Sequence, residues 1–234
     1  MDDTREPEAI VAARALVGER FGAALAAFLG GGVLSSRRTA TSDLDIVVVL
    51  AGPPAPYRES LHWRGWPAET FVHDAPSLEH FFAADTGRRR PSLARMIAEG
   101  AVLAGGAEDI TKVRERARAV LAAGPPVLSR AELEGYRYVL VDLLDDLAGA
   151  VDPGEMAVIG WNLWTATAEL ALLLKRHWLG SGKWLLRELR TADPELADEM
   201  VTAAGDPQRL SEVSRRVLDQ AGGPGWDGYR LAGR

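Results

Sequence analysis

The chain has 234 residues, of which 47% are hydrophobic and 26% are charged, a balance that is typical of globular proteins. It contains no cysteine, which excludes disulfides, thiolate zinc sites and a cysteine nucleophile. The net charge of −6 argues against an extended nucleic-acid-binding surface, because such surfaces need clustered lysine and arginine.

The chain shows no signal for a membrane or for export. Its apolar runs all fall short of the ~20 residues that a membrane-spanning helix needs. The acidic start, MDDTREPE, lacks the basic and apolar regions of a signal peptide. We therefore expect a cytoplasmic protein that does not bind membranes.

The first part of the chain predicts one helix and then strands. Residues 6–27 are rich in alanine, leucine and valine with spaced charges, and this pattern predicts an amphipathic helix. A glycine-rich turn and a polar loop then lead to the apolar, β-branched run 46–50, which predicts a buried strand. Residues 57–63 and 66–74 predict a β-hairpin around Arg64-Gly65.

The segment after the hairpin alternates between helices and one strand. We expect a short helix that begins at Ser77, helices over 92–99 and 109–122, and a strand over 101–104. The Gly-Pro-Pro run that starts at Gly124 is the best candidate for a domain boundary.

Beyond the Gly-Pro-Pro run the pattern predicts helices only. Ser129 is expected to cap the first of them, with Glu132 at the capping-box position. The expected helices cover residues 129–149, 153–179, 184–190, 194–203 and 208–220, followed by a loosely held glycine-rich tail. Four tryptophans are expected in their core: Trp161, Trp164, Trp178 and Trp184. We therefore predict an α+β chain, with a mixed sheet and flanking helices in residues 1–124 and an all-α bundle in residues 125–234.

Acidic residues gather at the entrance of the buried strand. Asp43 and Asp45 share one face of it, because side chains alternate along a strand, and two neighbouring carboxylates repel unless a cation lies between them. Glu69, on the predicted hairpin, is a candidate third carboxylate. At Gly31 and Gly32 the absence of a side chain lets backbone N–H groups approach a phosphate closely. This combination is typical of metal-assisted phosphoryl or nucleotidyl transfer.

The stretch GGVLSSRRTATSDLDIVVV resembles the polymerase-β-like nucleotidyltransferase superfamily. The shared pattern is a glycine turn, about ten residues, an Asp-hydrophobic-Asp motif on a strand and a third acid on a later strand. The stretch is most similar to the small bacterial branch, which includes aminoglycoside nucleotidyltransferases and minimal nucleotidyltransferases paired with helical HEPN-type partners. The resemblance is closest over 28–50 and rests on helical character alone over 129–220.

The resemblance implies the roles of the site residues. Asp43 and Asp45 become catalytic ligands of one or two Mg²⁺ ions, and Glu69 becomes a third ligand or the base that activates the acceptor hydroxyl. Gly31 and Gly32 become the turn that binds the phosphates of ATP or another nucleoside triphosphate, with Ser42 near it. The family commonly has serine at the position of Gly32, so backbone donors, Ser35 or Ser36 would have to replace that hydroxyl.

Two basic residues are further candidates for binding the nucleotide. Arg88 begins an Arg-Arg-Arg run that can meet the charge of a triphosphate, and Lys183 follows a Gly-Ser-Gly break. A solvent-exposed position is the alternative for both.

The expected function is the transfer of a nucleoside monophosphate, AMP from ATP in the first instance, to a hydroxyl of a small molecule, with release of pyrophosphate. An aminoglycoside-like polycation fits the acidic composition and the family. The alternatives are an antitoxin-like enzyme that transfers AMP to a HEPN-type toxin, and a catalytically silent nucleotide-binding regulatory module. A homodimer is compatible with the sequence.

Overall fold

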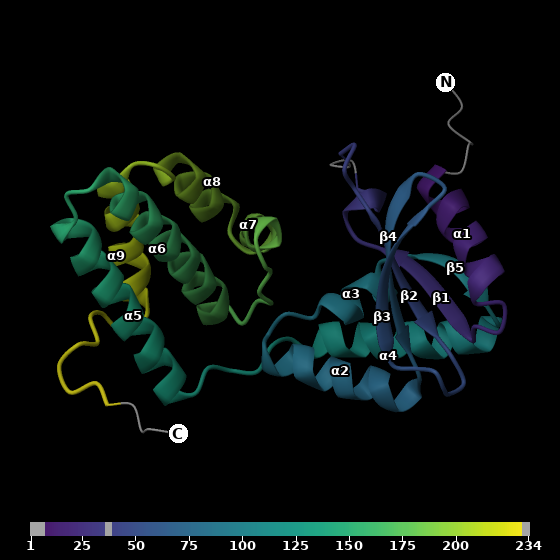
Figure 1. The fold of residues 1–234 in the computed structure, drawn as a ribbon. Coiled ribbons are helices and arrows are strands. Elements are labelled where there is room, and N and C mark those ends of the chain that lie inside the picture. Colours follow the sequence, from purple (N-terminus) through teal and green to yellow (C-terminus); the bar gives the residue numbers. More distant parts are fainter. Residues whose placement is uncertain (1–7, 36–38, 231–234) are drawn as a thin grey trace. The chain divides into compact units, whose positions relative to one another are not determined.

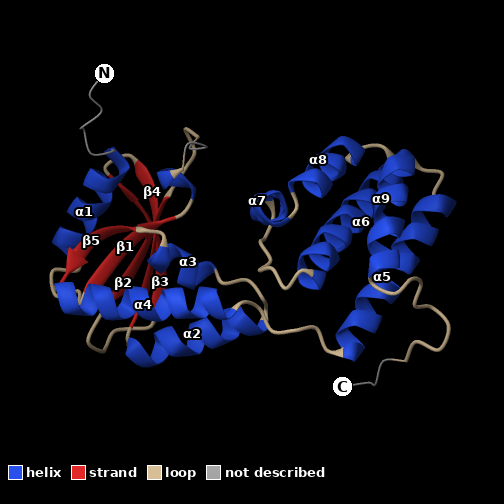
Figure 2. Ribbon diagram, turned by 180° about the vertical axis from the view of Figure 1, so that it is seen from behind, coloured by secondary structure: helices blue, strands red, loops and turns tan. Residues whose placement is uncertain are grey.

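The computed structural model describes residues 8–35 and 39–230, and the chain divides into two compact units, Met1–Ala123 and Gly124–Arg234. The first unit combines a five-stranded mixed sheet with flanking helices, and the second contains helices and loops but no strand among its described residues (Figures 1 and 2). The predicted α+β class is therefore confirmed.

The sheet of the first unit has the strand order β3-β4-β2-β1-β5. Its strands are β1 (Ala26–Gly30), β2 (Leu44–Val49), β3 (Tyr57–Trp63), β4 (Trp66–His73) and β5 (Ala101–Gly105). β2 and β4 run parallel, whereas the other neighbouring strands are antiparallel. The predicted hairpin is confirmed as β3 and β4. Since β2 and β4 are parallel neighbours, residues near the start of both strands lie at the same end of the sheet.

Helices cover both faces of this sheet (Figure 2). Leu44, Ile46 and Val48 pack toward α1 (Glu8–Arg20), whereas Val47 and Val49 pack toward the opposite layer. That layer consists of α2 (Ala75–Gly87), α3 (Ser92–Ala98) and α4 (Ala107–Ala123). Because side chains alternate along a strand, the acidic residues at the start of β2 lie on the face of α2, α3 and α4.

The predicted first helix was too long, and strand β1 was missed. Helix α1 ends at Arg20, and residues 26–30 form a fully buried strand between β2 and β5. Alanine and leucine favour a helix locally, so this run reads as helical on its own. Pairing with a strand on each side overrides that preference.

The predicted start of α2 at Ser77 was also wrong. Asp74 caps this helix, and its carboxylate accepts a hydrogen bond from the Ser77 amide at 2.9 Å. The Ser77 hydroxyl lies 2.9 Å from the Asp74 amide and completes a capping box. The Asp74 carboxylate therefore caps the N-terminus of α2.

His73, at the end of β4, makes the stability of the first unit dependent on pH. Burial lowers the pKa of His73 below its ordinary 6.5, although Asp74 and Asp85 oppose the shift, and its Nδ1 has no hydrogen-bond partner among the described residues. The unfolded state therefore binds the proton more readily below about pH 6.5, and stability falls as the pH drops. We expect Tm to fall more between pH 7.5 and 5.5 in the wild type than in His73→Gln. Replacement of the exposed His62 by glutamine is the control, and an equal effect of His62→Gln and His73→Gln on the pH dependence of Tm would contradict the assignment to His73.

The second unit consists of α5 (Arg130–Gly149), α6 (Pro153–Leu174), α7 (Lys183–Ala192), α8 (Pro194–Ala203) and α9 (Pro207–Gln220). The capping box of Ser129 and Glu132 at the start of α5 is confirmed. Helix α6 is shorter than predicted, because Lys175 leaves the helical conformation and Arg176 adopts a φ of +52°. All five of these helices contribute buried residues to the core of the unit.

Among the described residues, α6 alone is long and apolar enough to cross a membrane by length and composition. Its buried residues pack into the core of the helical unit, as those of a core helix do: Leu163, Trp164, Thr167, Ala168, Leu170, Ala171, Leu172 and Leu173. Trp164 and Trp178 are buried as predicted, but Trp161 is 62% exposed. Trp161 instead stacks on Trp164, with the two rings 4° from parallel.

The segment after α9 was predicted to be loosely held, and the structure contradicts this over the residues described. Arg137 donates hydrogen bonds to backbone carbonyls of this segment, including that of Pro224 at 2.7 Å. The ring of Tyr138 stacks on Trp226 at 4.9 Å and on Tyr229 at 4.4 Å between centroids. Ring stacking and hydrogen bonds to a charged group therefore fasten this segment to α5.

Candidate metal centre

Three carboxylates converge at the end of the sheet where the neighbouring strands β2 and β4 begin. Asp43 directly precedes β2, Asp45 is the second residue of β2, and Glu69 lies opposite Asp45 in the parallel register of β2 and β4. One oxygen from each of the three lies within 4.8 Å of the others, and all three residues are partly buried. The structure therefore brings together the three acids that the sequence singled out.

The carboxylate of Glu69 is held by two donors from the neighbouring strand. Nη2 of Arg58 lies 2.6 Å from each of its oxygens, and the Ser60 hydroxyl donates to Oε1 at 3.2 Å. The hydrogen bond to Glu69 raises the pKa of Arg58 above its ordinary value, and attraction by Glu69 and Asp45 acts in the same direction. Arg58 thus offsets part of the negative charge of the cluster.

The contact of Arg58 with Glu69 was not predicted from the sequence, although the register of the predicted hairpin indicates it. Pairing outward from the Arg64-Gly65 turn sets Ser60 opposite Glu69 and Arg58 opposite Phe71. Since alternate residues share a face, Arg58 and Ser60 must lie on the face of Glu69. Counting along the predicted hairpin would have found both.

The backbone at Gly31 lies directly against the carboxylate of Asp45. Gly31 has a φ of +78°, and a Cβ added there would lie 2.1 Å from Oδ2 of Asp45. Only glycine combines this conformation with this close approach. The adjacent Gly32 differs, because a Cβ there would meet no atom of the described residues within 4 Å.

The donor set fits Mg²⁺. Carboxylate oxygens are the hard ligands that this ion prefers, and because each lies about 2.1 Å from the ion, two ligand oxygens are at most about 4.2 Å apart. In an octahedron at most one pair of three ligands is that far apart and the other pairs are about 3.0 Å apart, so oxygens within 4.8 Å of one another would close in by up to about 1.8 Å to become ligands. Asp43, Asp45 and Glu69 are the residues that would hold the ion.

Comparisons with known proteins found similarity among solved structures. No family model matches the chain, and a search of curated proteins found no match. Among solved structures, a nucleotidyltransferase-like protein from Exiguobacterium sibiricum 255-15 is similar over 90% of this chain and 74% of its own length. The TM-score is 0.44 and the sequence identity is 11%, so the likeness does not bear on the chemistry of the centre.

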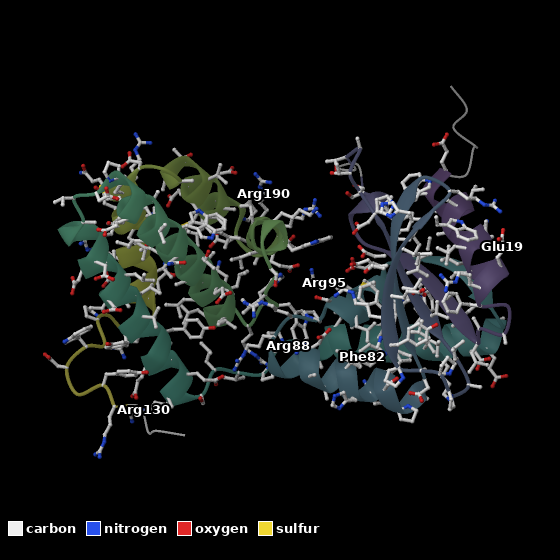
Figure 3. The ribbon with its side chains drawn as sticks, viewed as in Figure 1. Glu19, Phe82, Arg88, Arg95, Arg130 and Arg190 are labelled. Carbon is white, nitrogen blue, oxygen red and sulfur yellow. The ribbon has the colours of Figure 1, made fainter. Side chains whose placement is uncertain are left out.

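The remaining predicted nucleotide-binding residues have local roles in the structure. The Ser42 hydroxyl accepts a hydrogen bond from the Thr39 amide at 3.0 Å and closes the turn before Asp43. Arg88 ends α2, is exposed and donates to Asp85 at 2.6 Å (Figure 3). Lys183 is the exposed first residue of α7 in the second unit. Their contacts with a nucleotide stay predictions, and Ser36 lies outside the described residues.

Proposed function

We propose that this chain is a Mg²⁺-dependent nucleotidyltransferase that transfers a nucleoside monophosphate, AMP from ATP in the first instance, to a hydroxyl of a small molecule. Pyrophosphate is the second product. The observation that carries this proposal is the convergence of Asp43, Asp45 and Glu69 within 4.8 Å beside the glycine turn at Gly31. Such a carboxylate cluster next to the backbone N–H groups of a glycine turn suits a metal-bound triphosphate.

Each residue of the centre has a distinct task in this mechanism. When bound, Mg²⁺ would neutralise the triphosphate and the charge that develops on the leaving group. Asp43 and Asp45 provide ligand oxygens at fixed positions, because β2 holds them at its entrance. Gly31 and Gly32 allow phosphate oxygens to approach the backbone, because no side chain intervenes.

Glu69 fits the role of a metal ligand better than that of a base. Arg58 and Ser60 already donate to its oxygens, at the lone pairs where a proton from the acceptor hydroxyl would otherwise go. These two donors fix the orientation of the Glu69 carboxylate. We therefore assign Glu69 to metal binding and leave the acceptor proton to another group.

The helical unit is the proposed source of acceptor specificity, and an aminoglycoside-like polycation remains the proposed acceptor. The net charge of −6 favours a cationic substrate electrostatically. An antitoxin-like enzyme that modifies a HEPN-type toxin would instead copurify with a small helical protein.

The test is release of pyrophosphate by the purified chain with MgATP and a panel of polyhydroxylated amines. The proposal expects release that requires both the metal and one acceptor class, and that is lost in Asp45→Asn. Binding of ATP without turnover across the panel would favour the silent regulatory module. Release that is unchanged in Asp45→Asn would contradict the assignment of the centre.

A further inference from the structure

The ion pair of Arg58 and Glu69 limits how the candidate metal centre can bind a cation. A single nitrogen of Arg58, Nη2, is 2.6 Å from Oε1 and 2.6 Å from Oε2 of Glu69. A donor at equal distances from both oxygens lies in the plane that bisects the carboxylate. A cation chelated by both oxygens would lie in that same plane, beside the same two atoms, where it meets the guanidinium.

Few lone pairs of Glu69 remain for a metal. Each carboxylate oxygen offers about two lone-pair sites. Oε1 accepts from both Arg58 and Ser60, so its sites are used, whereas Oε2 accepts from Arg58 alone among the described residues. Glu69 is therefore left with one site, on Oε2, and can bind a metal through one oxygen only.

The sheet keeps Arg58 in this position. Arg58 and Ser60 lie on β3 opposite Phe71 and Glu69 of β4, and the guanidinium lies 5.0 Å from the centroid of the Phe71 ring. Backbone pairing and the aromatic contact both restrict where the guanidinium can move. The Arg58 side chain is nevertheless 60% exposed, so it can be replaced without opening the core.

We propose that Arg58 sets the cation selectivity of the centre in favour of Mg²⁺ over Ca²⁺, an inference that rests on the metal-dependent function proposed above. Mg²⁺ binds single carboxylate oxygens in an octahedral shell completed by water, whereas Ca²⁺ takes more oxygens and often both from one carboxylate. By blocking the two-oxygen mode of Glu69, Arg58 removes an arrangement that only the larger ion uses well.

The experiment measures Mn²⁺ binding to the full chain by electron paramagnetic resonance and displaces it with Mg²⁺ or Ca²⁺. In Arg58→Met we expect the ratio of Ca²⁺ affinity to Mg²⁺ affinity to rise about tenfold, the scale at which residues behind metal ligands act. Arg116→Met is the matched control. Arg116 also binds a glutamate, Glu79, at 2.8 and 2.6 Å and lies 5.8 Å from the centroid of the Phe82 ring, so its loss removes a similar pair elsewhere in the unit.

The outcomes separate this inference from the function on which it rests. A ratio within about twofold of the wild type in both Arg58→Met and Arg58→Gln would overturn the role of Arg58. Ser60→Ala leaves the bisecting position blocked, so an equal rise in that variant would also overturn it. If the wild type binds no Mn²⁺ at all, the metal-dependent function itself fails. Thermal melts establish that each variant is folded.

Discussion

In Asp43→Asn, metal-dependent pyrophosphate release is expected to fall at least about 100-fold, because one of three ligands of the proposed ion is lost. The metal-free variant is at the same time expected to melt slightly above the wild type. The three carboxylates lie within 4.8 Å of one another, and Arg58 offsets only part of their charge. Removing one charge relieves about 1 kcal/mol of repulsion, which corresponds to roughly 2–4 °C in Tm.

A loss of activity together with a gain in Tm in Asp43→Asn distinguishes a metal site from a cluster of acids with a purely structural role. Calorimetry in EDTA and in MgCl₂ measures both parts: Mg²⁺ should raise the Tm of the wild type and leave that of Asp43→Asn unchanged. Glu115→Gln, an exposed acid on α4 of the same unit, is the control and should behave as the wild type does. If Asp43→Asn keeps its activity and its response to Mg²⁺, Asp43 is not a ligand.

The parts of the fold that the sequence predicted well are those with strong local signals. The alternating arms around Arg64-Gly65 and the capping box at Ser129 are each specified by a few neighbouring residues. Strand β1 was missed because its Ala-Leu-rich residues favour a helix until β2 and β5 flank them. The attachment of the C-terminal segment to Tyr138 joins residues far apart in the chain, and no local pattern reveals it.

The candidate site shows the same division between local and long-range information. The placement of Asp43 and Asp45 on one face could be predicted from a single strand, because side chains alternate between the two faces along it. The meeting of Glu69 with Asp45 depends on the parallel register of β2 and β4, which is a property of the sheet. Arg58 lies between these cases, since the hairpin register predicts its face but only the structure shows how it contacts both oxygens of Glu69.

Alanine substitutions at the adjacent Gly31 and Gly32 test the metal centre, because we expect Gly31→Ala to lower both Tm and Mn²⁺ affinity and Gly32→Ala to lower neither. Gly31 has φ +78° and ψ −170°, a conformation essentially confined to glycine that costs alanine about 1–3 kcal/mol, and the new methyl group would lie 2.1 Å from Oδ2 of Asp45. The carboxylate can swing away, so Gly31→Ala should remain folded with Tm lower by roughly 2–12 °C. That movement displaces a ligand, and we expect Mn²⁺ affinity to fall at least about tenfold.

Gly32→Ala is the control for this test. A Cβ at Gly32 meets nothing within 4 Å in the part of the chain that the structure describes, and the φ of Gly32 lies outside the left-handed region, so alanine fits without strain. Its Tm should equal or slightly exceed that of the wild type, because alanine reduces the freedom of the unfolded chain. Its Mn²⁺ affinity should be unchanged. Equal losses of Mn²⁺ affinity in the two variants would show that the turn acts through backbone flexibility, whereas a loss at Gly31 alone ties the close approach to Asp45 to metal binding.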